Sequence, residues 1–191
     1  WCARDAELLT SMETRSGSAA EWSRLYRALD ELDILHVLFD ADTRHDVSTV
    51  AEAASCLAMH SPSLALLVVQ QNLAARLLGD ARAARPRGWV ALPLYDGAVE
   101  WPYQLRVRPS DRGYVADGRW SSIPALPFAS SLLLPLASAE HADFALVELR
   151  FEQPRIGVVR GAAVTALGLR GCPVADLRCA SALFAEGDVV I

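Results

Sequence analysis

The first half of the chain has the spacing of apolar residues that is typical of α-helices. Ser18-x-x-Glu21 has the pattern of a capping box, in which the serine side chain accepts from the first turn and the glutamate bonds back. An apolar stripe at steps of three and four follows it. The stripe consists of Trp22, Leu25, Leu29, Leu32, Leu35 and Phe39. This spacing predicts one amphipathic helix through the whole segment.

Two further helices are predicted before residue 80. A second capping pattern at Thr49-x-x-Glu52 predicts a helix that starts there. Ser61 is expected to cap a third helix, in which Pro62 takes the first position because its missing N–H costs nothing there. This helix should run to about Leu78 and end with Gly79 as its C-cap. A weaker apolar spacing indicates a short helix at residues 7–12.

Beyond residue 85 the pattern changes to short segments that alternate or are rich in β-branched residues. These segments predict strands at residues 89–94, 104–108, 113–115, 130–136, 144–151, 156–160 and 174–181. Because helices precede strands, we expect an α+β chain with a helical domain at residues 1–85 and a β domain at residues 86–191. The β domain should be a small antiparallel barrel or sandwich.

The composition favours a folded protein and excludes several classes of partner. Apolar residues make up 52% and charged residues 21% of the 191 residues, enough for a buried core. The net charge of −5 gives no general attraction to nucleic acid. The apolar runs fall short of the roughly 20 residues that a membrane span needs, and the first residues lack the apolar core of a signal peptide. We therefore expect a cytoplasmic protein.

Side chains that often carry chemistry are scattered rather than clustered. The four cysteines form no Cys-x-x-Cys pair and have no histidine at a ligand-like spacing, so we expect reduced thiols and no metal site. A hairpin that brings Cys172 to Cys179 is an open alternative. His36, His45, His60 and His141 are isolated in sequence, and all 18 basic residues are arginine, which excludes a lysine nucleophile. No general catalytic motif is present.

Three segments, taken together, resemble the acyl-CoA dehydrogenase family. Residues 50–75 are similar to the paired N-terminal helices of that family, and residues 113–119 (GYVADGR) are similar to its Gly-Tyr-x-Leu-Asn-Gly-x-Lys hairpin. Residues 167–177 (LGLRGCPVADL) resemble its Leu-Gly-x-Arg-(Gly/Ser)-Ser-x-x-x-x-Leu segment. The order and spacing of the three agree with the family. The resemblance covers residues 20–191 and implies an N-terminal helical domain followed by the middle β domain.

The resemblance implies FAD as cofactor and the α,β-dehydrogenation of an acyl thioester, carried by CoA or a carrier protein, as in fatty acid metabolism. It places the flavin ring between two groups of residues and the thioester near a third. The flavin groups are Leu92, Pro93 and Leu94, and Ser122, Ile123 and Pro124, and the thioester residues are Gly97 and Ala98. Pro93 and Val99 stand where the family has hydroxyl residues. The alternative is therefore a non-catalytic homologue that has lost FAD and serves as a binding or scaffold module.

The family's catalytic glutamate lies in a C-terminal helical bundle, which the resemblance places after the last residue of this sequence. No residue of the chain is therefore expected to act as the catalytic base. We expect either a fragment of a longer protein, a partner polypeptide that supplies the bundle, or a non-catalytic relative; a related flavin monooxygenase is a further alternative. Since the helices at residues 50–60 and 62–78 are strongly apolar, we also expect a homo-oligomer or a partner chain that covers them.

Overall fold

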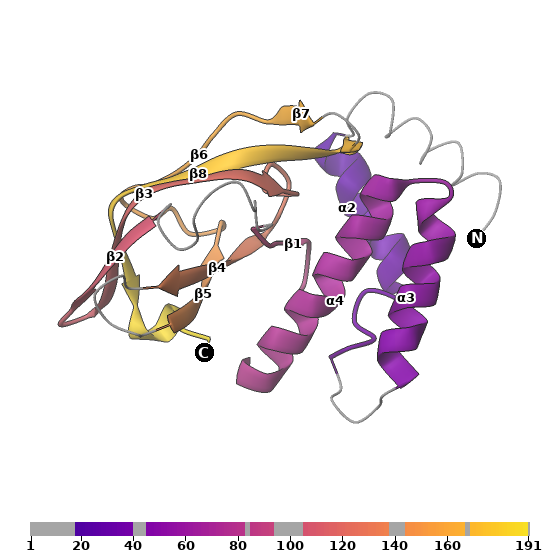
Figure 1. Ribbon diagram of the computed structural model, residues 1–191, viewed down its shortest axis with the longest axis horizontal. Coiled ribbons are helices and arrows are strands. Elements are labelled where there is room, and N and C mark those ends of the chain that lie inside the picture. Colours follow the sequence, from indigo (N-terminus) through magenta and orange to yellow (C-terminus); the bar gives the residue numbers. More distant parts are fainter. Residues whose placement is uncertain are drawn as a thin grey trace.

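The computed structural model describes residues 18–39, 45–82, 85–93, 105–137, 144–166 and 169–190, and these form the predicted α+β fold (Figure 1). The helices of the described residues are α2 (Ala19–Asp30), α3 (His45–Ala58) and α4 (Pro62–Arg82). Figure 1 shows them together on one side of the molecule, with the strands on the other. The predicted short helix at residues 7–12 lies outside the described residues.

The strands form two sheets. One has the order β1 (Val90–Ala91), β4 (Ser131–Ala137) and β5 (Phe144–Arg150). The other has the order β2 (Leu105–Ser110), β3 (Gly113–Pro124), β8 (Leu169–Ala185) and β6 (Val158–Arg160), and β7 (Val164–Ala166) also pairs with β8. A short 3-10 helix, η1 (Glu186–Asp188), follows β8.

The two sheets form a sandwich and not a closed barrel, which settles the choice that the sequence left open. Within the described residues, an isolated bridge pairs Val147 of β5 with Val189, in the segment that follows η1. The strand pairs are antiparallel, as expected, except that β1 runs parallel to β4. The chain leaves β1 at Ala91 and returns through the other sheet before β4, so the connection is long enough for a parallel pair.

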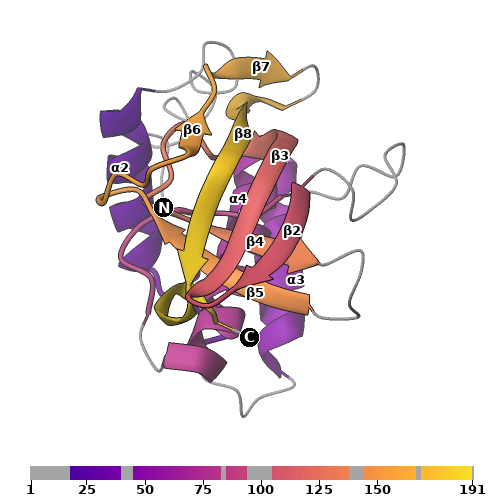
Figure 2. The same ribbon diagram turned by 90° about the vertical axis from the view of Figure 1, so that its left-hand side faces the viewer.

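The strand β4 is buried on both faces because it lies in the middle of three layers. Leu132 and Leu134 point into the sandwich core, which also contains Trp120 and Phe184 of the other sheet. Leu133, on the opposite face, packs with Ala74 and Leu78 of α4. The helix thus covers one face of the β1-β4-β5 sheet, and the β2-β3-β8-β6 sheet covers the other, as the two views agree (Figures 1 and 2).

The capping box at Ser18 is confirmed, but the helix after it is shorter than the apolar stripe predicts. The Ser18 Oγ accepts from the Glu21 N–H at 3.3 Å, and the Ser18 N–H donates to Glu21 Oε2 at 2.7 Å. The helix α2 ends at Asp30, and Asp33 has a φ of +58°. The Ile34 N–H reaches back to the Leu29 carbonyl, as in a Schellman motif. Leu35 reaches the core after this turn, so the stripe continues without a helix.

The helices α3 and α4 begin or end at other residues than the sequence predicts. The helix α3 starts at His45, so Thr49 lies inside it and is not its cap. The cap of α4 is confirmed, since Ser61 Oγ accepts from the Leu64 N–H at 3.1 Å. Gly79 is not a C-cap, because α4 continues to Arg82. A Cβ at Gly79 would stand 3.0 Å from the Phe39 carbonyl oxygen, so a close chain approach explains this glycine.

Two glutamines of α4 attach the helix to the start of the β half. Gln71 accepts from the Val90 N–H at 3.0 Å and donates to the Gly88 carbonyl at 3.2 Å. Gln70 donates to the Leu92 carbonyl at 3.2 Å. The two glutamine side chains thus form hydrogen bonds with backbone groups in and beside β1, on the edge that does not pair with β4. These buried backbone groups are thereby satisfied. The division between domains at residues 85 and 86 stays a prediction.

The strands β3 and β8 are much longer than the predicted segments at residues 113–115 and 174–181. Both contain polar residues and small residues that break the alternation, and their ladder has two register shifts. Cys172 and Cys179 lie on the same strand, β8, so the alternative of a hairpin between them is wrong. Both are buried free thiols, whereas Cys56 is an exposed free thiol.

Candidate functional site

The first group of predicted flavin residues lies just after β1, and its described members are Leu92 and Pro93. Leu92 is buried in the cluster that joins α4 to the β1-β4-β5 sheet, and its carbonyl is occupied by Gln70. Pro93 is half-buried and has no N–H to offer. Leu94 and the predicted thioester residues Gly97 and Ala98 lie outside the described residues, so their roles stay predictions.

The second group lies on β3, at a β-bulge between Trp120 and Ile123. Ile123 is fully buried in the sandwich core, and Pro124 is buried beside it. Ser122 is exposed, has a φ of +56°, and donates its N–H to Asp176 Oδ1 of β8 at 3.1 Å. The Asp176 carboxylate also forms an ion pair with Arg119. Its oxygens are therefore used to hold the bulge together.

The other register shift of the β3–β8 ladder is held in the same way, with the strands exchanged. Ser181 of β8 has a φ of +49° and donates its N–H to Asp117 Oδ1 of β3 at 2.6 Å. At each shift a serine lies in the left-handed region, and an aspartate on the opposite strand accepts its N–H. Sequence reasoning missed both aspartates, because nothing in their local pattern distinguishes them from solvated surface residues.

The described residues of the two groups offer a flavin few backbone donors. Pro93 and Pro124 have no N–H, the Ser122 N–H is taken by Asp176, and the Ile123 side chain faces the core. Of the five described residues in the two groups, Ser122 alone offers an exposed hydroxyl. The two groups also lie in different sheets, since Leu92 follows β1 and Ser122 lies in β3.

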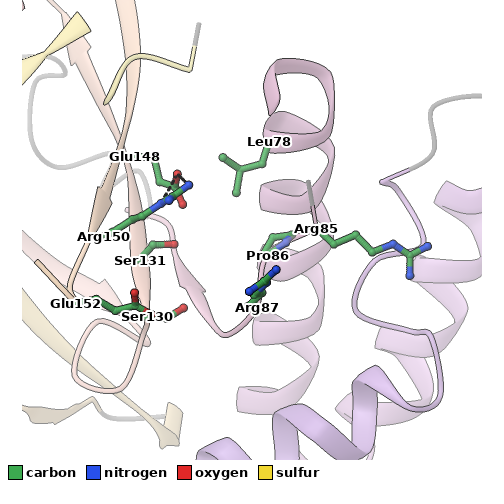
Figure 3. Close-up of a pocket in the computed structure, with 9 residues that line it drawn as sticks. All are labelled: Leu78, Arg85, Pro86, Arg87, Ser130, Ser131, Glu148, Arg150 and Glu152. Carbon is green, nitrogen blue, oxygen red and sulfur yellow. Dashed lines mark hydrogen bonds and ion pairs between the residues drawn. The ribbon is translucent and has the colours of Figure 1, made fainter. Parts of the chain in front are cut away.

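A cleft of about 360 Å³ lies between the end of α4 and the β1-β4-β5 sheet (Figure 3). Leu78 lines it from α4, and Arg87 lines it from the segment that follows the helix. The sheet contributes residues at the start of β4 and along β5. These are Ser130, Ser131, Glu148, Arg150 and Glu152. Sequence reasoning did not find this cleft, because its walls come from four separate segments of the chain.

Glu148 is a buried carboxylate in this cleft, with 7% of its surface exposed. Its Oε2 lies 3.1 Å from both Nε and Nη2 of Arg150, and Figure 3 shows the two side chains together above Ser131. The Glu148 carboxylate is therefore paired within the fold, by a residue of its own strand.

His36 is not isolated in the fold, although it is isolated in sequence. Its Nδ1 lies 3.0 Å from Asp30 Oδ1, and its Nε2 lies 3.3 Å from Tyr26 Oη. Tyr26 also donates its hydroxyl proton to the Pro86 carbonyl at 2.8 Å. Burial lowers the pKa of His36, although Asp30 acts in the opposite direction. Burial, together with the Asp30 charge, raises the pKa of Tyr26, so the phenol stays protonated at neutral pH.

The tryptophans of the β half are core residues where the structure describes them. Trp89 donates its Nε1 proton to the Trp22 carbonyl at 2.9 Å and packs edge-on against Tyr26. Trp120 lies in the sandwich core. Trp101 lies outside the described residues. The part of the chain that the structure describes contains no group of three potential metal ligands and no helix long and apolar enough to span a membrane.

Comparison with solved structures identifies the fold. The chain superimposes over 98% of its length on an acyl-CoA dehydrogenase from Bacillus anthracis complexed with FAD, with a TM-score of 0.67 and 14% identity. It matches FkbI, a protein for biosynthesis of the methoxymalonyl extender unit of the polyketide immunosuppressant Fk520, over 98% of its length, with a TM-score of 0.66 and 19% identity. The chain therefore has an acyl-CoA dehydrogenase-like fold, as the sequence resemblance predicted.

The chain spans 34% of the length of the Bacillus anthracis dehydrogenase and 54% of the length of FkbI. Since the identities are below 20%, these similarities establish the fold and leave the activity to be proposed. No protein-family model matches the sequence, and no curated protein matches it.

Proposed function

We propose that this chain is a binding module with an acyl-CoA dehydrogenase-like fold, which holds an acyl thioester without oxidising it. The observation that supports this proposal most directly is that backbone groups at the expected flavin surface are already hydrogen-bonded to other residues of the chain. The Ser122 N–H is bonded to Asp176, and the Leu92 carbonyl is bonded to Gln70. A flavin at this surface would have to displace both interactions. The buried Glu148 carboxylate is paired with Arg150.

The thioester ligand is proposed for the cleft between α4 and β5. Its wall combines the apolar side chain of Leu78 with the hydroxyls of Ser130 and Ser131 and the guanidinium of Arg150. Such a mixture of an apolar wall and a few polar groups is typical of small-molecule sites. A volume of about 360 Å³ accommodates the thioester end and a short acyl chain but not a whole CoA molecule.

The experiment combines colour with binding. Purified protein should be colourless and should take up no added FAD, while calorimetry should detect binding of a short-chain acyl-CoA. The variant Glu152→Trp places a large side chain in the cleft and should abolish acyl-CoA binding, because Glu152 is an exposed lining residue. Glu186→Trp, at an exposed position outside the cleft, is the control. Equal affinity of the two variants would contradict the location, and flavin absorbance in the purified protein would contradict the loss of FAD.

The second candidate is a flavoprotein that carries out α,β-dehydrogenation of an acyl thioester. It is supported by the similarity in fold to a dehydrogenase complexed with FAD. On this alternative the catalytic base and most cofactor contacts come from residues beyond the described ones or from another polypeptide. The full-length reading frame, expressed and assayed for acyl-CoA oxidation with an artificial electron acceptor, distinguishes the two candidates.

Self-association, or cover by a partner chain, also stays a proposal, as does the cytoplasmic location. Several large apolar side chains of α3, of α4 and of the turn between them are exposed, which supports the first of these. They include Val47, Met59, Val69 and Leu73, with exposed fractions from 43% to 77%. Light scattering tests it, since a clean monomer at high concentration would contradict it.

A further inference from the structure

A second hollow, of about 570 Å³, lies on the other side of the segment Arg85–Arg87 from the cleft of Figure 3. The helix α2 contributes Tyr26, Arg27 and Asp30 to it, and His36 lies in the segment that follows this helix. Arg85 and Arg87 complete its wall. Arg85, Pro86 and Arg87 line both this hollow and that cleft, whereas the residues from α2 and His36 line this hollow and not the cleft.

The charges of this hollow favour an anion. Three guanidinium groups, those of Arg27, Arg85 and Arg87, face one carboxylate, that of Asp30, among the residues that line it. Arg85 is partly neutralised by Asp33, at 3.2 Å. Arg87 is exposed and has no ion-pair partner within the described parts of the chain. The local excess of positive charge contrasts with the net charge of −5 of the whole sequence.

The floor of the hollow is polar and fixed in position. His36 and Tyr26 are 4% and 6% exposed, and both are held by hydrogen-bond partners on separate segments. The His36 Nδ1 lies 3.0 Å from Asp30 Oδ1, and Tyr26 donates its hydroxyl proton to the Pro86 carbonyl. The His36 Nε2 lies 3.3 Å from the Tyr26 oxygen. A neutral imidazole can donate from only one of its two nitrogens, whereas the imidazolium donates from both.

We propose that this hollow binds a phosphate group, and that His36 takes up a proton when the phosphate binds. Guanidinium groups recognise phosphate oxygens through paired charge-assisted hydrogen bonds, which suits Arg27 of α2 and Arg87 of the segment after α4. A bound dianion stabilises the imidazolium that the Asp30 and Tyr26 contacts favour. Besides these two, the charged groups that act on His36 are Arg85 and Asp33. The proposal does not depend on thioester binding in the neighbouring cleft.

Calorimetric titration with inorganic phosphate and, separately, with coenzyme A tests the proposal and distinguishes free phosphate from phosphate carried on a larger molecule. Saturable binding of either is expected to weaken about tenfold or more in Arg87→Gln and in Arg27→Gln, since each loses a charged hydrogen bond. Arg106→Gln, at an exposed position on β2, is the matched control and should bind as the original protein does. Far-UV circular dichroism confirms that each variant is folded.

The proton uptake is measured by repeating the titration in two buffers that differ in ionisation enthalpy. The heat should differ between buffers for the original protein, and this difference should shrink in His36→Gln. The proposal is overturned if neither compound binds, or if binding is equal in the arginine variants and the control. Binding with no buffer dependence overturns the role of His36. Glu152 lines the other cleft and Arg27 lines this hollow, so Glu152→Trp should leave phosphate binding unchanged and Arg27→Gln should leave acyl-CoA binding unchanged. These two variants distinguish failure of one proposal from failure of the other.

Discussion

The substitution Asp176→Ala tests whether the carboxylates at the two register shifts hold the β3–β8 ladder. In the structure, Asp176 accepts the Ser122 N–H at 3.1 Å and pairs with Arg119. Removing the carboxylate leaves Ser122, at a φ of +56°, without its acceptor. The serine must then keep a left-handed conformation that only the surrounding ladder imposes.

The expected cost is moderate, because these groups are partly open to water. A hydrogen bond to a charged group contributes about 1.5–3 kcal/mol, but water can replace the acceptor at the exposed Ser122. The ion pair with Arg119, whose side chain is 53% exposed, adds about 0–1 kcal/mol. We therefore expect Asp176→Ala to lower the free energy of unfolding by about 1–2 kcal/mol, or the melting temperature by roughly 2–8 °C.

Urea unfolding followed by tryptophan fluorescence measures this change. Asp111→Ala, in the exposed turn between β2 and β3, is the control and should change stability by less than about 0.5 kcal/mol. Ser122→Gly, combined with Asp176→Ala, should recover part of the loss, because glycine adopts the positive φ without strain. If Asp176→Ala is as stable as the control, the carboxylate does not hold the bulge and the reasoning is refuted.

Three further substitutions test other parts of the fold. Gly79→Val should destabilise the protein by about 1–3 kcal/mol in urea, since its side chain would press on Phe39, and Ala at the same position should cost less. Burial lowers the pKa of His36. Stability should therefore fall as the pH drops below about 6.5, because the unfolded chain binds the proton first. In an acid titration, His36→Gln should lose less free energy of unfolding over this range. Burial raises the pKa of Cys179 to about 11. Stability should therefore also fall between about pH 9 and 11, where the unfolded thiol ionises and the folded one does not. In Cys179→Ala the melting temperature should depend less on pH over that range.

Local signals in the sequence predicted the parts of the fold that local physics determines. The caps at Ser18 and Ser61 are recognisable because the capping side chain bonds within its own first turn. The Thr49 pattern has the same residue types but lies inside α3, since a helix can continue through a possible cap when its preceding residues also favour it. The fold class follows from the change in periodicity near residue 85 and is confirmed.

The candidate sites depend on contacts between distant segments, and the sequence could not supply them. Asp117 and Asp176 act across a ladder, and their partners Ser181 and Ser122 lie more than 50 residues away in the chain. The surroundings of His36 also include a distant segment. The Tyr26 hydroxyl, which contacts His36, donates its proton to the Pro86 carbonyl, 60 residues further along the chain than Tyr26. The resemblance to a known family predicted the fold, but not how this chain has used the backbone groups at the expected flavin surface.

The position of the cleft follows from the length of α4 relative to the sheet that it covers. Leu146 and Glu148 project from the same face of β5, since they are two residues apart on one strand. Leu146 packs with Leu78 in the cluster under the helix. Glu148, about 7 Å further along the strand, lies where the apolar cover gives way to Arg87 and Arg150. The change from leucine to glutamate on this face therefore marks the limit of helix cover, and a sheet face left partly open beside a helix end provides the volume in which a ligand can bind.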